Sequence, residues 1–362
     1  MLPLSYPLIL SVYPRHLSTD VALFRGPVRV FVSSRSHRRE ELVRFVRVRD
    51  QLPIRIRAVE DVAVEHSLDL SSVEAFVACG GLVGPVRGGF YRVDRAMEEV
   101  LGDGTFGEHV YNLGGLMVHR LSRSYGGVPL VGDPVSTFEL CPEARLSGMV
   151  GCHREPVFHA LSQRSAARFA AGRLGRAYRD CRLVVAHLGY GISVGAHLDG
   201  LVVEVNDALH GEGPFSLERA GSLPTLGLLE LAYSGRHDME DLRGMITRDG
   251  GLARHLGCRD FMGVEALVRR GDQRALEVFD AFVSGISKEI AARATVLRGE
   301  VDAVVLTGPM VAWDRLVSQL EDRCGWIAPV ITVKGQDELA DLAMGALEVL
   351  SGRVEPLVLG DR

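Results

Sequence analysis

The pattern of apolar and polar residues repeats once along this chain. Residues 8–32 read LILSVYPRHLSTDVALFRGPVRVFV, and residues 182–206 read RLVVAHLGYGISVGAHLDGLVVEVN. Each segment holds three apolar runs of strand length separated by short turns, and such runs, rich in Val, Ile and Leu, predict β-strands. A repeated unit of this kind predicts one fold that is present in two related halves.

Strands and helices are expected to alternate through the rest of the chain. Further strands are predicted at 73–78, 128–131 and 301–307, and the polar, arginine-rich stretch 33–49 is expected to begin a surface helix. Other helices are predicted at 107–124, 154–172, 226–234, 273–297, 313–323 and 337–351. This order predicts an α/β protein with two mixed sheets and a cleft between them.

The length of the chain also favours two lobes, because 362 residues are too many for one hydrophobic core. We expect an N-terminal lobe over 1–175, a C-terminal lobe over 176–350 and a tail over 351–362. A return of the last helix to the first lobe is left open as an alternative.

The composition is that of an ordinary soluble globular protein, with 47% hydrophobic and 24% charged residues. The formal net charge of −5 gives no general attraction to nucleic acid or to anionic membranes. No apolar run is long enough to span a bilayer, and the N-terminal segment is interpreted as a strand and not as a signal peptide. The six cysteines lack CxxC pairs, which disfavours a zinc site and predicts reduced thiols in the cytoplasm.

The first turn of each repeat is the candidate phosphate-binding element. In the second copy, Gly189 and Gly191 flank Tyr190, and glycine lets backbone N–H groups approach an anion closely. In the first copy the turn runs from Tyr13 to Asp20 and contains no glycine. The two copies therefore differ at the point where a two-lobed fold would hold phosphate.

Four runs of sequence carry a resemblance to a known family. They are FGEHVYNLGGL (106–116), FHALSQRSAARF (158–169), AHLGYGISVGAH (186–197) with VNDALHGEGPFSLERAGSLP (205–224), and VDAVVLTGP (301–309) with KGQDELADLAMGAL (334–347). In these runs the chain resembles the butyrate kinases, in the acetate and butyrate kinase family of the sugar kinase, Hsp70 and actin superfamily. The resemblance implies duplicated actin-like, ribonuclease H-like ATPase domains with mixed sheets and a central cleft.

The resemblance also implies a reaction, its ligands and an assembly. A short-chain carboxylate such as butanoate attacks the γ-phosphate of ATP, reversibly and with Mg²⁺, to give ADP and an acyl phosphate. Such chemistry depends on positioning and on positive charge around the migrating phosphoryl group. A homodimer or larger homo-oligomer is implied as well.

Four residues match the family's catalytic positions. Arg219 matches the arginine placed at the phosphoryl group and the carboxylate, and His187 matches a hydrogen-bond donor to the phosphoryl group. Asp133 matches an acidic residue that positions the phosphoryl group or binds magnesium, although a turn before proline equally predicts a cap. His109 and Asn112 are expected one helical turn apart on a face bordering the cleft, or else as caps.

The nucleotide and metal positions follow from the same resemblance. Gly189 and Gly191 would approach the phosphates, Gly308 would let the adenosine pass close to the backbone, and Asp260 would contact the ribose or adenine. Glu338 matches the carboxylate that reaches the magnesium shell, with Asp133 as the second candidate ligand. Glu338 also opens a predicted helix, where an acidic residue is favoured by the helix dipole.

The departures from the family cluster at the site. Family members read Asn-Pro-Gly-Ser-Thr-Ser-Thr-Lys in the first turn, where this chain has Arg15 for the glycine and Asp20 for the lysine. A family arginine is missing from the segment Ala78-Cys79-Gly80-Gly81, and Arg15 and Arg87 are both candidates to replace its charge. The alternative function is therefore an impaired or inactive paralog that retains nucleotide or acyl phosphate binding, in a regulatory or partner role. Action on a sugar is disfavoured because no sugar-kinase motif is present.

Overall fold

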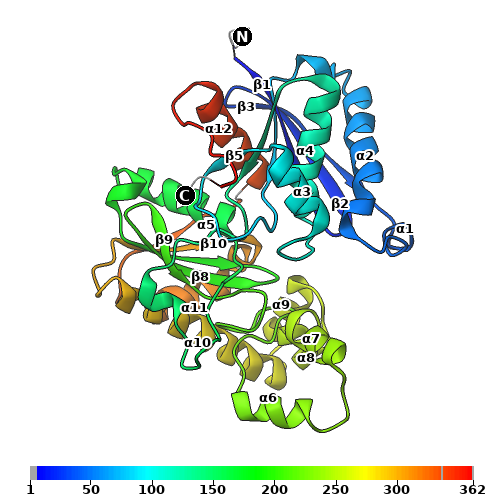
Figure 1. Ribbon diagram of the computed structural model, residues 1–362. Helices are drawn as coiled ribbons and strands as arrows, with labels where there is room; N and C mark the ends of the chain where they lie inside the picture. Colours follow the sequence, from blue (N-terminus) through cyan, green and yellow to red (C-terminus); the bar gives the residue numbers. More distant parts are fainter. Residues whose placement is uncertain (1–5, 336, 361–362) are drawn as a thin grey trace. The chain divides into compact units, whose positions relative to one another are not determined.

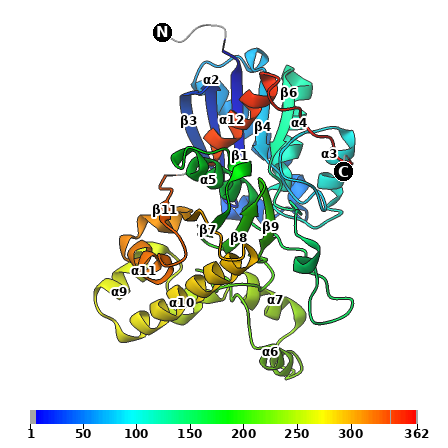
Figure 2. The same ribbon diagram turned by 90° about the vertical axis from the view of Figure 1, so that its left-hand side faces the viewer.

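The chain folds into two units, each built on one mixed β-sheet with helices on both faces (Figures 1 and 2). The computed structural model describes residues 6–335 and 337–360. The first unit takes the described residues up to Thr137 together with those from Asp337 onward, and the second begins at Phe138 and ends at 335. Among the described residues, no helix is long and apolar enough to cross a membrane.

The first unit has a six-stranded sheet in the order β3-β2-β1-β4-β6-β5. The strands β1, β2 and β3 form an antiparallel meander, β4 and β6 run parallel to β1, and β5 is antiparallel to β6. Their bounds are β1 (Leu8–Pro14), β2 (Ser18–Arg25), β3 (Val28–Ser36), β4 (Ala75–Cys79), β5 (Phe90–Arg92) and β6 (Val128–Gly132).

Helices cover both faces of this sheet. On one face α4 (Asn112–Tyr125) packs on β4 and β6, with α2 (Leu52–Glu65) beside it and α3 (Arg95–Asp103) against α4. On the other face the C-terminal helix α12 (Glu338–Leu350) packs on β1 and β4. The last helix therefore belongs with the first sheet. The short elements of this unit are α1 (Arg39–Leu42) and the 3-10 helices η1 (Val48–Gln51) and η2 (Leu70–Ser72).

The second unit has a five-stranded sheet in the order β11-β10-β7-β8-β9. Here β7, β8 and β9 form the antiparallel meander, and β10 and β11 extend the sheet in parallel from β7. The bounds are β7 (Leu183–Leu188), β8 (Ile192–Leu198), β9 (Leu201–Val205), β10 (Ala303–Thr307) and β11 (Val330–Thr332).

The helices of the second unit again form two layers. Helix α5 (Ala160–Arg173) packs on β7 and β10, and the long helix α10 (Gln273–Val296) packs on β7 and β8 with α11 (Asp314–Cys324) against it. A smaller group follows β9 in the sequence: α6 (Thr225–Ala232), α7 (Met239–Thr247), α8 (Gly251–Leu256) and α9 (Phe261–Arg269). The 3-10 helices are η3 (Pro142–Arg145), η4 (Tyr178–Asp180) and η5 (Pro309–Ala312).

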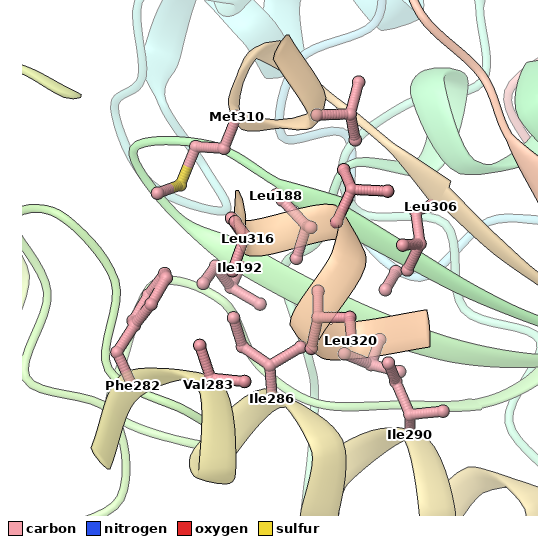
Figure 3. Packing of buried hydrophobic residues seen from close by; sticks show 14 of the residues in the cluster. Leu188, Ile192, Phe282, Val283, Ile286, Ile290, Leu306, Met310, Leu316 and Leu320 are labelled. Carbon is pink, nitrogen blue, oxygen red and sulfur yellow. The ribbon is translucent and has the colours of Figure 1, made fainter. Parts of the chain in front are cut away.

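The main core of the second unit lies between its sheet and helix α10 (Figure 3). Leu188 and Ile192 from β7 and β8 meet Phe282, Ile286 and other fully buried side chains of α10. Alternate residues of β7 point to opposite faces of the strand, so Leu183 and Val185 pack instead with the alanines of α5. Because both faces are buried, every residue of β7 is buried, which explains its nearly continuous apolar sequence.

The two sheets share one topology. The order β3-β2-β1-β4-β6 in the first unit corresponds strand for strand to β9-β8-β7-β10-β11 in the second, with the same strand directions. The predicted repeat and the predicted fold class, duplicated actin-like α/β domains with mixed sheets, are confirmed. The cleft expected between the lobes stays a prediction.

Several predicted helices begin later than their sequence suggests. The helix expected at 107–124 begins at Asn112, and the one expected at 154–172 begins at Ala160. The stretch 33–49 forms the end of β3, the four-residue helix α1 and the start of η1, not one surface helix. The chain passes to the second unit after Thr137, whereas the sequence-based boundary was expected after residue 175, because α5 packs on β7 and β10.

Candidate functional site

The glycine turn of the second unit holds a guanidinium group. The turn at 189–191 joins β7 to β8, and Gly189 and Gly191 are both buried. A Cβ atom added to Gly191 would lie 2.1 Å from Nη1 of Arg219 and 2.8 Å from its Cζ. Arg219 therefore lies directly against Gly191, and only a residue without a side chain allows that approach.

Hydrogen bonds fix the loop that carries Arg219 to this turn. The Ser216 hydroxyl donates to the carbonyl of Tyr190 at 2.5 Å and accepts the backbone N–H of Arg219 at 3.2 Å. The guanidinium Nη1 itself donates to the carbonyl of Ala208 at 2.5 Å. Arg219 is thus held at both its backbone and its side chain beside the turn.

Helices α7 and α8 support the same loop from behind. The N–H of Ala220 donates to the carbonyl of Ile246 at 3.0 Å, and the N–H of Gly250 donates to the carbonyl of Glu218 at 2.9 Å. A mainly apolar cavity of about 380 Å³ lies beside these contacts, lined by Phe215, Ala220, Ser222, Leu223, Leu228, Leu231, Leu242, Met245, Ile246, Asp249, Gly250, Gly251, Arg254 and His255. Backbone hydrogen bonds therefore hold the Arg219 loop against α7 and the start of α8, and an apolar cavity lies next to the loop.

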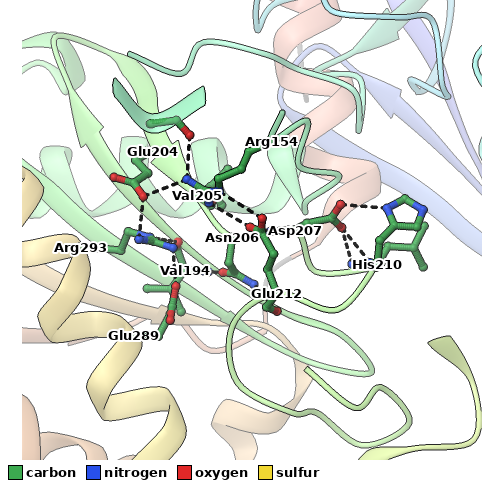
Figure 4. Close-up of polar contacts among 12 residues, drawn as sticks. Arg154, Val194, Glu204, Val205, Asn206, Asp207, His210, Glu212, Glu289 and Arg293 are labelled. Carbon is green, nitrogen blue, oxygen red and sulfur yellow. Dashed lines mark hydrogen bonds and ion pairs between the residues drawn. The ribbon is translucent and has the colours of Figure 1, made fainter. Parts of the chain in front are cut away.

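Arg154 fixes the other loop that contacts Arg219 (Figure 4). Its guanidinium donates to the carbonyl of Val205 at 2.9 Å and pairs with Glu204 at 3.1 Å and Glu212 at 2.9 Å. The Glu212 carboxylate also accepts the backbone N–H of Asp207 at 3.0 Å. This network orders the segment after β9 that contains the carbonyl acceptor of Arg219.

His187, the last but one residue of β7, is a buried histidine next to the glycine turn. A Cβ on Gly189 would lie 3.1 Å from its Nε2, and its ring stacks on that of His159 at 3.9 Å between centroids. Its Nδ1 is buried and has no hydrogen-bond partner among the described residues. Burial, with a smaller effect of Arg219, lowers the pKa of His187 to about 3, so the ring is neutral. A neutral imidazole with Nε2 beside the turn suits a hydrogen bond to a bound group.

A buried hydrogen-bond chain supports the stacked histidine pair. Nδ1 of His159 is 2.9 Å from the Ser193 hydroxyl, which also accepts from Gln163 Nε2 at 2.7 Å. Gln163 Oε1 in turn lies 3.0 Å from Nε2 of His197, and Nδ1 of His197 is 2.7 Å from the Tyr178 hydroxyl. The sequence did not point to His159 or Gln163 as neighbours of the site.

The two buried histidines predict an acid-sensitive stability. Burial lowers the pKa of both His187 and His197 to about 3, whereas an unfolded histidine titrates near its ordinary value of about 6.5. The unfolded state therefore binds more protons between these limits, so stability is complete above pH ~6.5 and falls as the pH drops toward 3. We expect the free energy of unfolding to fall by about 2 kcal/mol per histidine between pH 7 and pH 5.

Urea titrations at several pH values from 7 to 5 measure this fall in the free energy of unfolding. His187→Phe should roughly halve the fall, since the His187 ring makes no hydrogen bond through Nδ1. The control His66→Asn, at an exposed histidine, should leave the fall unchanged. A wild-type slope near zero would contradict the expectation.

Two further residues expected to contact the nucleotide lie in the second unit: Gly308 lies against the end of β7, and Asp260 caps a helix. Gly308 follows β10 with φ of +93°, and a Cβ there would lie 2.5 Å from the carbonyl oxygen of Leu188 at the end of β7. The Asp260 carboxylate accepts the N–H of Gly263 at 2.7 Å and so caps α9, while the next residue, Phe261, contacts the ring of Tyr190. Whether Gly308 and Asp260 contact a nucleotide stays a prediction.

The first turn, in the other unit, is occupied by an internal ion network. Arg15 donates from Nε to Asp20 at 2.5 Å and from Nη2 to Glu338 at 3.0 Å. The Tyr13 hydroxyl donates to the second oxygen of Glu338 at 3.3 Å, and the guanidinium lies over the Tyr13 ring at 4.7 Å. The two family departures, Arg15 and Asp20, are therefore partners of each other.

Aromatic rings and a buried arginine surround this network. Tyr13 is buried against Tyr111, and burial followed by the charge of Glu338 raises the pKa of Tyr111 to about 12. Arg55 on α2 is fully buried and donates to the carbonyls of Ser18 and His16, which braces the turn from below. The sequence predicts no helix over 52–65, so nothing in it points to Arg55 as a neighbour of the first turn.

His109 and Asn112 do not share a helical face. His109 precedes α4 and packs its ring on Tyr111 and His16, so the expected shared face is wrong. The alternative, a role at the helix N-terminus, agrees with the contact in which Nδ1 of His109 accepts the N–H of Tyr111 at 3.3 Å. Asn112 begins α4, where its side chain accepts the N–H of Leu82 at 2.9 Å and donates to the carbonyl of Gly107 at 3.0 Å. The Asn112 side chain thus ties two loops together.

Asp133 lies at the end of β6, as its sequence predicts. It is 1% exposed and has φ of +36°, an uncommon backbone conformation for a residue with a side chain. Its N–H donates to the carbonyl of Gly89 at 2.8 Å. The strained, buried carboxyl is consistent with a functional residue, and its role in catalysis or metal binding stays a prediction.

Glu338, which is expected to reach the magnesium shell, fits that ion poorly. Both carboxylate oxygens of Glu338 accept hydrogen bonds, one of them from a cation. Within the described ranges, no three His, Cys, Asp or Glu side chains are grouped closely enough to hold a metal ion. The nucleotide fits better, because the second turn offers a buried glycine backbone, a guanidinium and a neutral imidazole.

The structure thus brings together one group of predicted residues in each unit. In the second unit, His187, Gly189, Gly191, Arg219 and Gly308 surround the β7 to β8 turn. In the first unit, Glu338 joins the first turn, with His109 near it through Tyr111.

Comparisons with known proteins agree with this fold. Residues 150–317 match the model of the acetokinase family, and this segment contains the glycine turn and Arg219. In three dimensions the chain is similar to the acetate kinase of Porphyromonas gingivalis, with a TM-score of 0.74 at 16% identity, over 95% of this chain and 100% of that one.

Two further solved structures show the same likeness. A propionate kinase from Francisella tularensis has a TM-score of 0.74 at 14% identity, over 94% of this chain and 98% of that one. The acetate kinase of Entamoeba histolytica has a TM-score of 0.71 at 12% identity, over 93% and 98%. At these identities the likeness establishes the fold alone.

Proposed function

We propose that this protein is a carboxylate kinase of the acetokinase family that acts on a short-chain fatty acid, with butanoate as the proposed acid. A carboxylate oxygen of the acid forms a bond to the γ-phosphorus of ATP while the bond from that phosphorus to the bridging oxygen of ADP breaks. The products are butanoyl phosphate and ADP, and the reaction is reversible. The family match over 150–317 supports the reaction class, and the sequence resemblance supports the acid.

The observation that carries this proposal is the contact between Arg219 and the glycine turn. A guanidinium 2.1 Å from a Cβ built on Gly191 would lie beside any phosphate bound on the backbone of that turn. Its planar N–H groups can contact two anionic oxygens at once and stabilise the charge on a phosphoryl group in transfer. Arg219 is thus the proposed transition-state stabiliser.

The other proposed roles rest on the sequence resemblance and agree with the positions of these residues around the same turn. His187, which is neutral and has Nε2 beside Gly189, would donate a hydrogen bond to the phosphoryl group. Gly189 and Gly191 would contact the phosphates, and Gly308 would let the adenosine lie close to the backbone. Asp260 would contact the ribose or adenine in addition to capping α9.

In the first unit, Asp133 and His109 are proposed to act on the phosphoryl group. Arg15 is engaged by two carboxylates, whereas the side chain of Arg87 is exposed on its loop, so Arg87 is the better candidate to replace the missing family arginine. Mg²⁺ would enter with ATP, since this ion keeps most of its ligands from phosphate and water and needs only one or two carboxylates. A homo-oligomer in the cytoplasm is the proposed setting.

An acyl phosphate assay tests the function. We expect purified protein with ATP, Mg²⁺ and butanoate to give hydroxamate-trapped acyl phosphate, with a higher kcat/KM for butanoate than for acetate. Propanoate and isovalerate complete the series, and Arg219→Ala protein prepared in the same way is the control. Turnover equal to the enzyme-free blank with all four acids would rule out the proposed kinase activity.

A second candidate is a non-catalytic relative that binds nucleotide or acyl phosphate in a regulatory or partner role. The observation that favours it is the first turn, where the cation Arg15 is already paired with two carboxylates, Asp20 and Glu338. Calorimetric titration with ADP separates the candidates, because the second predicts saturable binding without turnover. The absence of both binding heat and a thermal shift with ADP would rule out both candidate functions.

A further inference from the structure

We propose that Arg15 is a built-in cation that takes the place of a divalent metal ion at Glu338, so that the first turn of this chain does not bind Mg²⁺. The inference concerns cation binding and holds whether or not the protein turns over ATP. It arises from the disagreement between the metal ligand that the resemblance implies and the contacts that Glu338 makes.

The first step is the state of the Glu338 carboxylate. Its Oε2 accepts from Nη2 of Arg15 at 3.0 Å, and its Oε1 accepts from the Tyr13 hydroxyl at 3.3 Å. Both oxygens are therefore engaged, and one of them by a positive charge. A metal ion entering here would have to displace the guanidinium, because two cations at one carboxylate repel each other.

The second step is that Arg15 is anchored from another side as well. Its Nε donates to Asp20 at 2.5 Å, and the other Asp20 oxygen accepts from the Ser34 hydroxyl at 2.6 Å. One guanidinium thus bridges two carboxylates that come from β2 and from the start of α12. A planar guanidinium is suited to such bridging, whereas Mg²⁺ demands octahedral oxygen ligands.

The third step is the burial of the surroundings. The side chains of Asp20 and Glu338 are 16% and 21% exposed, and Tyr13 beneath them is 4% exposed. Removal of Arg15 would leave two partly buried carboxylates without their shared cation. Such a pair attracts a divalent cation, because oxygen ligands of this type are the ones that Mg²⁺ and Mn²⁺ prefer.

A titration with Mn²⁺ tests this proposal without nucleotide or substrate. The decrease in the electron paramagnetic resonance signal of free Mn²⁺ measures the amount bound. We expect the wild-type chain to show no saturable Mn²⁺ site with Kd below about 1 mM. Arg15→Gln, which removes the charge and retains much of the side-chain length, should gain one site per chain that is at least tenfold tighter. Arg15→Gln with Glu338→Gln should lose that site again.

A matched control comes from the neighbouring ion pair. Arg29 pairs with Asp337, the residue before Glu338, and Arg29→Gln changes the net charge by the same amount. That variant should bind Mn²⁺ no better than the wild type. Circular dichroism and the unfolding temperature establish that each variant is folded, and Arg15→Ala serves as a second variant if Arg15→Gln is not.

Two results would overturn the proposal. One is a wild-type Mn²⁺ site tighter than about 1 mM that Glu338→Gln abolishes, since Glu338 would then be available to metal. The other is a folded Arg15 variant that gains no site. Neither result bears on the kinase assay, so the proposed function and this inference fail separately.

Discussion

Arg219→Ala should lower the turnover number for acyl phosphate formation by about 10²–10³-fold, the usual loss when one donor to a developing charge is removed. The reason is local, since the guanidinium lies on the buried glycine turn and its loop is fixed independently by Ser216. The affinity for ADP should change by no more than about threefold, because the backbone N–H groups of the turn remain. Steady-state kinetics and calorimetric titration with ADP measure the two effects.

Arg219→Lys is the informative companion variant. Lysine retains the charge but loses the planar fork that contacts two oxygens, so an intermediate turnover number is expected. Equal losses of turnover and of ADP affinity in Arg219→Ala would contradict the assignment, because they would make Arg219 a ground-state binder.

Gly191→Ala should lower the turnover number nearly as much as Arg219→Ala, by at least about 100-fold. Gly191 does not have a left-handed φ, so alanine is compatible with its backbone, but the new Cβ would overlap Nη1 and Cζ of Arg219. The guanidinium must therefore move away from the turn. Because the displaced group ends a flexible side chain, the free energy of unfolding should change little.

Two controls isolate the displacement of Arg219. Gly227→Ala lies on α6, where an added Cβ meets nothing within 4 Å, and it should leave the turnover number unchanged. In the double variant Gly191→Ala with Arg219→Ala, the losses should not add, because both changes remove the same interaction. Additive losses would mean that Gly191 acts through something other than Arg219.

The sequence predicts the fold best where strands are buried on both faces, as β1 and β7 are along nearly their whole length. The runs at 8–32 and 182–206 each contain three apolar stretches separated by short turns, and the structure forms three strands from each, although β3 has no buried residue. The long helix predicted at 273–297 is confirmed within one residue at its C-terminal end. Such elements can be recognised because their local pattern and their tertiary burial agree.

The sequence predicts less where tertiary contacts decide the structure. The segment 107–111 has residues compatible with a helix, yet the helix begins only at Asn112, whose side chain ties two loops together. The partnership of Arg15 with Glu338 could not be predicted, because 323 positions separate them in the chain. Residue spacing carries no information on contacts that only the fold creates.

Part of the site follows from local sequence and part from resemblance. Gly189 and Gly191 are identified by the turn itself, and the structure places Arg219 and His187 beside them. The substitution of Arg15 and Asp20 for the family's glycine and lysine is visible in the sequence as a loss. The structure adds that Arg15 and Asp20 form an ion pair with each other. The two substitutions therefore form a new ion network in the first turn.

The placement of α12 has a consequence for the order of events during synthesis. The first sheet lacks its second helical layer until the ribosome has translated residues 338–350, by which time the whole second unit has been made. Domains generally fold as units as they emerge. The nascent first unit therefore exposes one apolar sheet face, including β1 and β4, for most of translation, and the C-terminal helix completes it last.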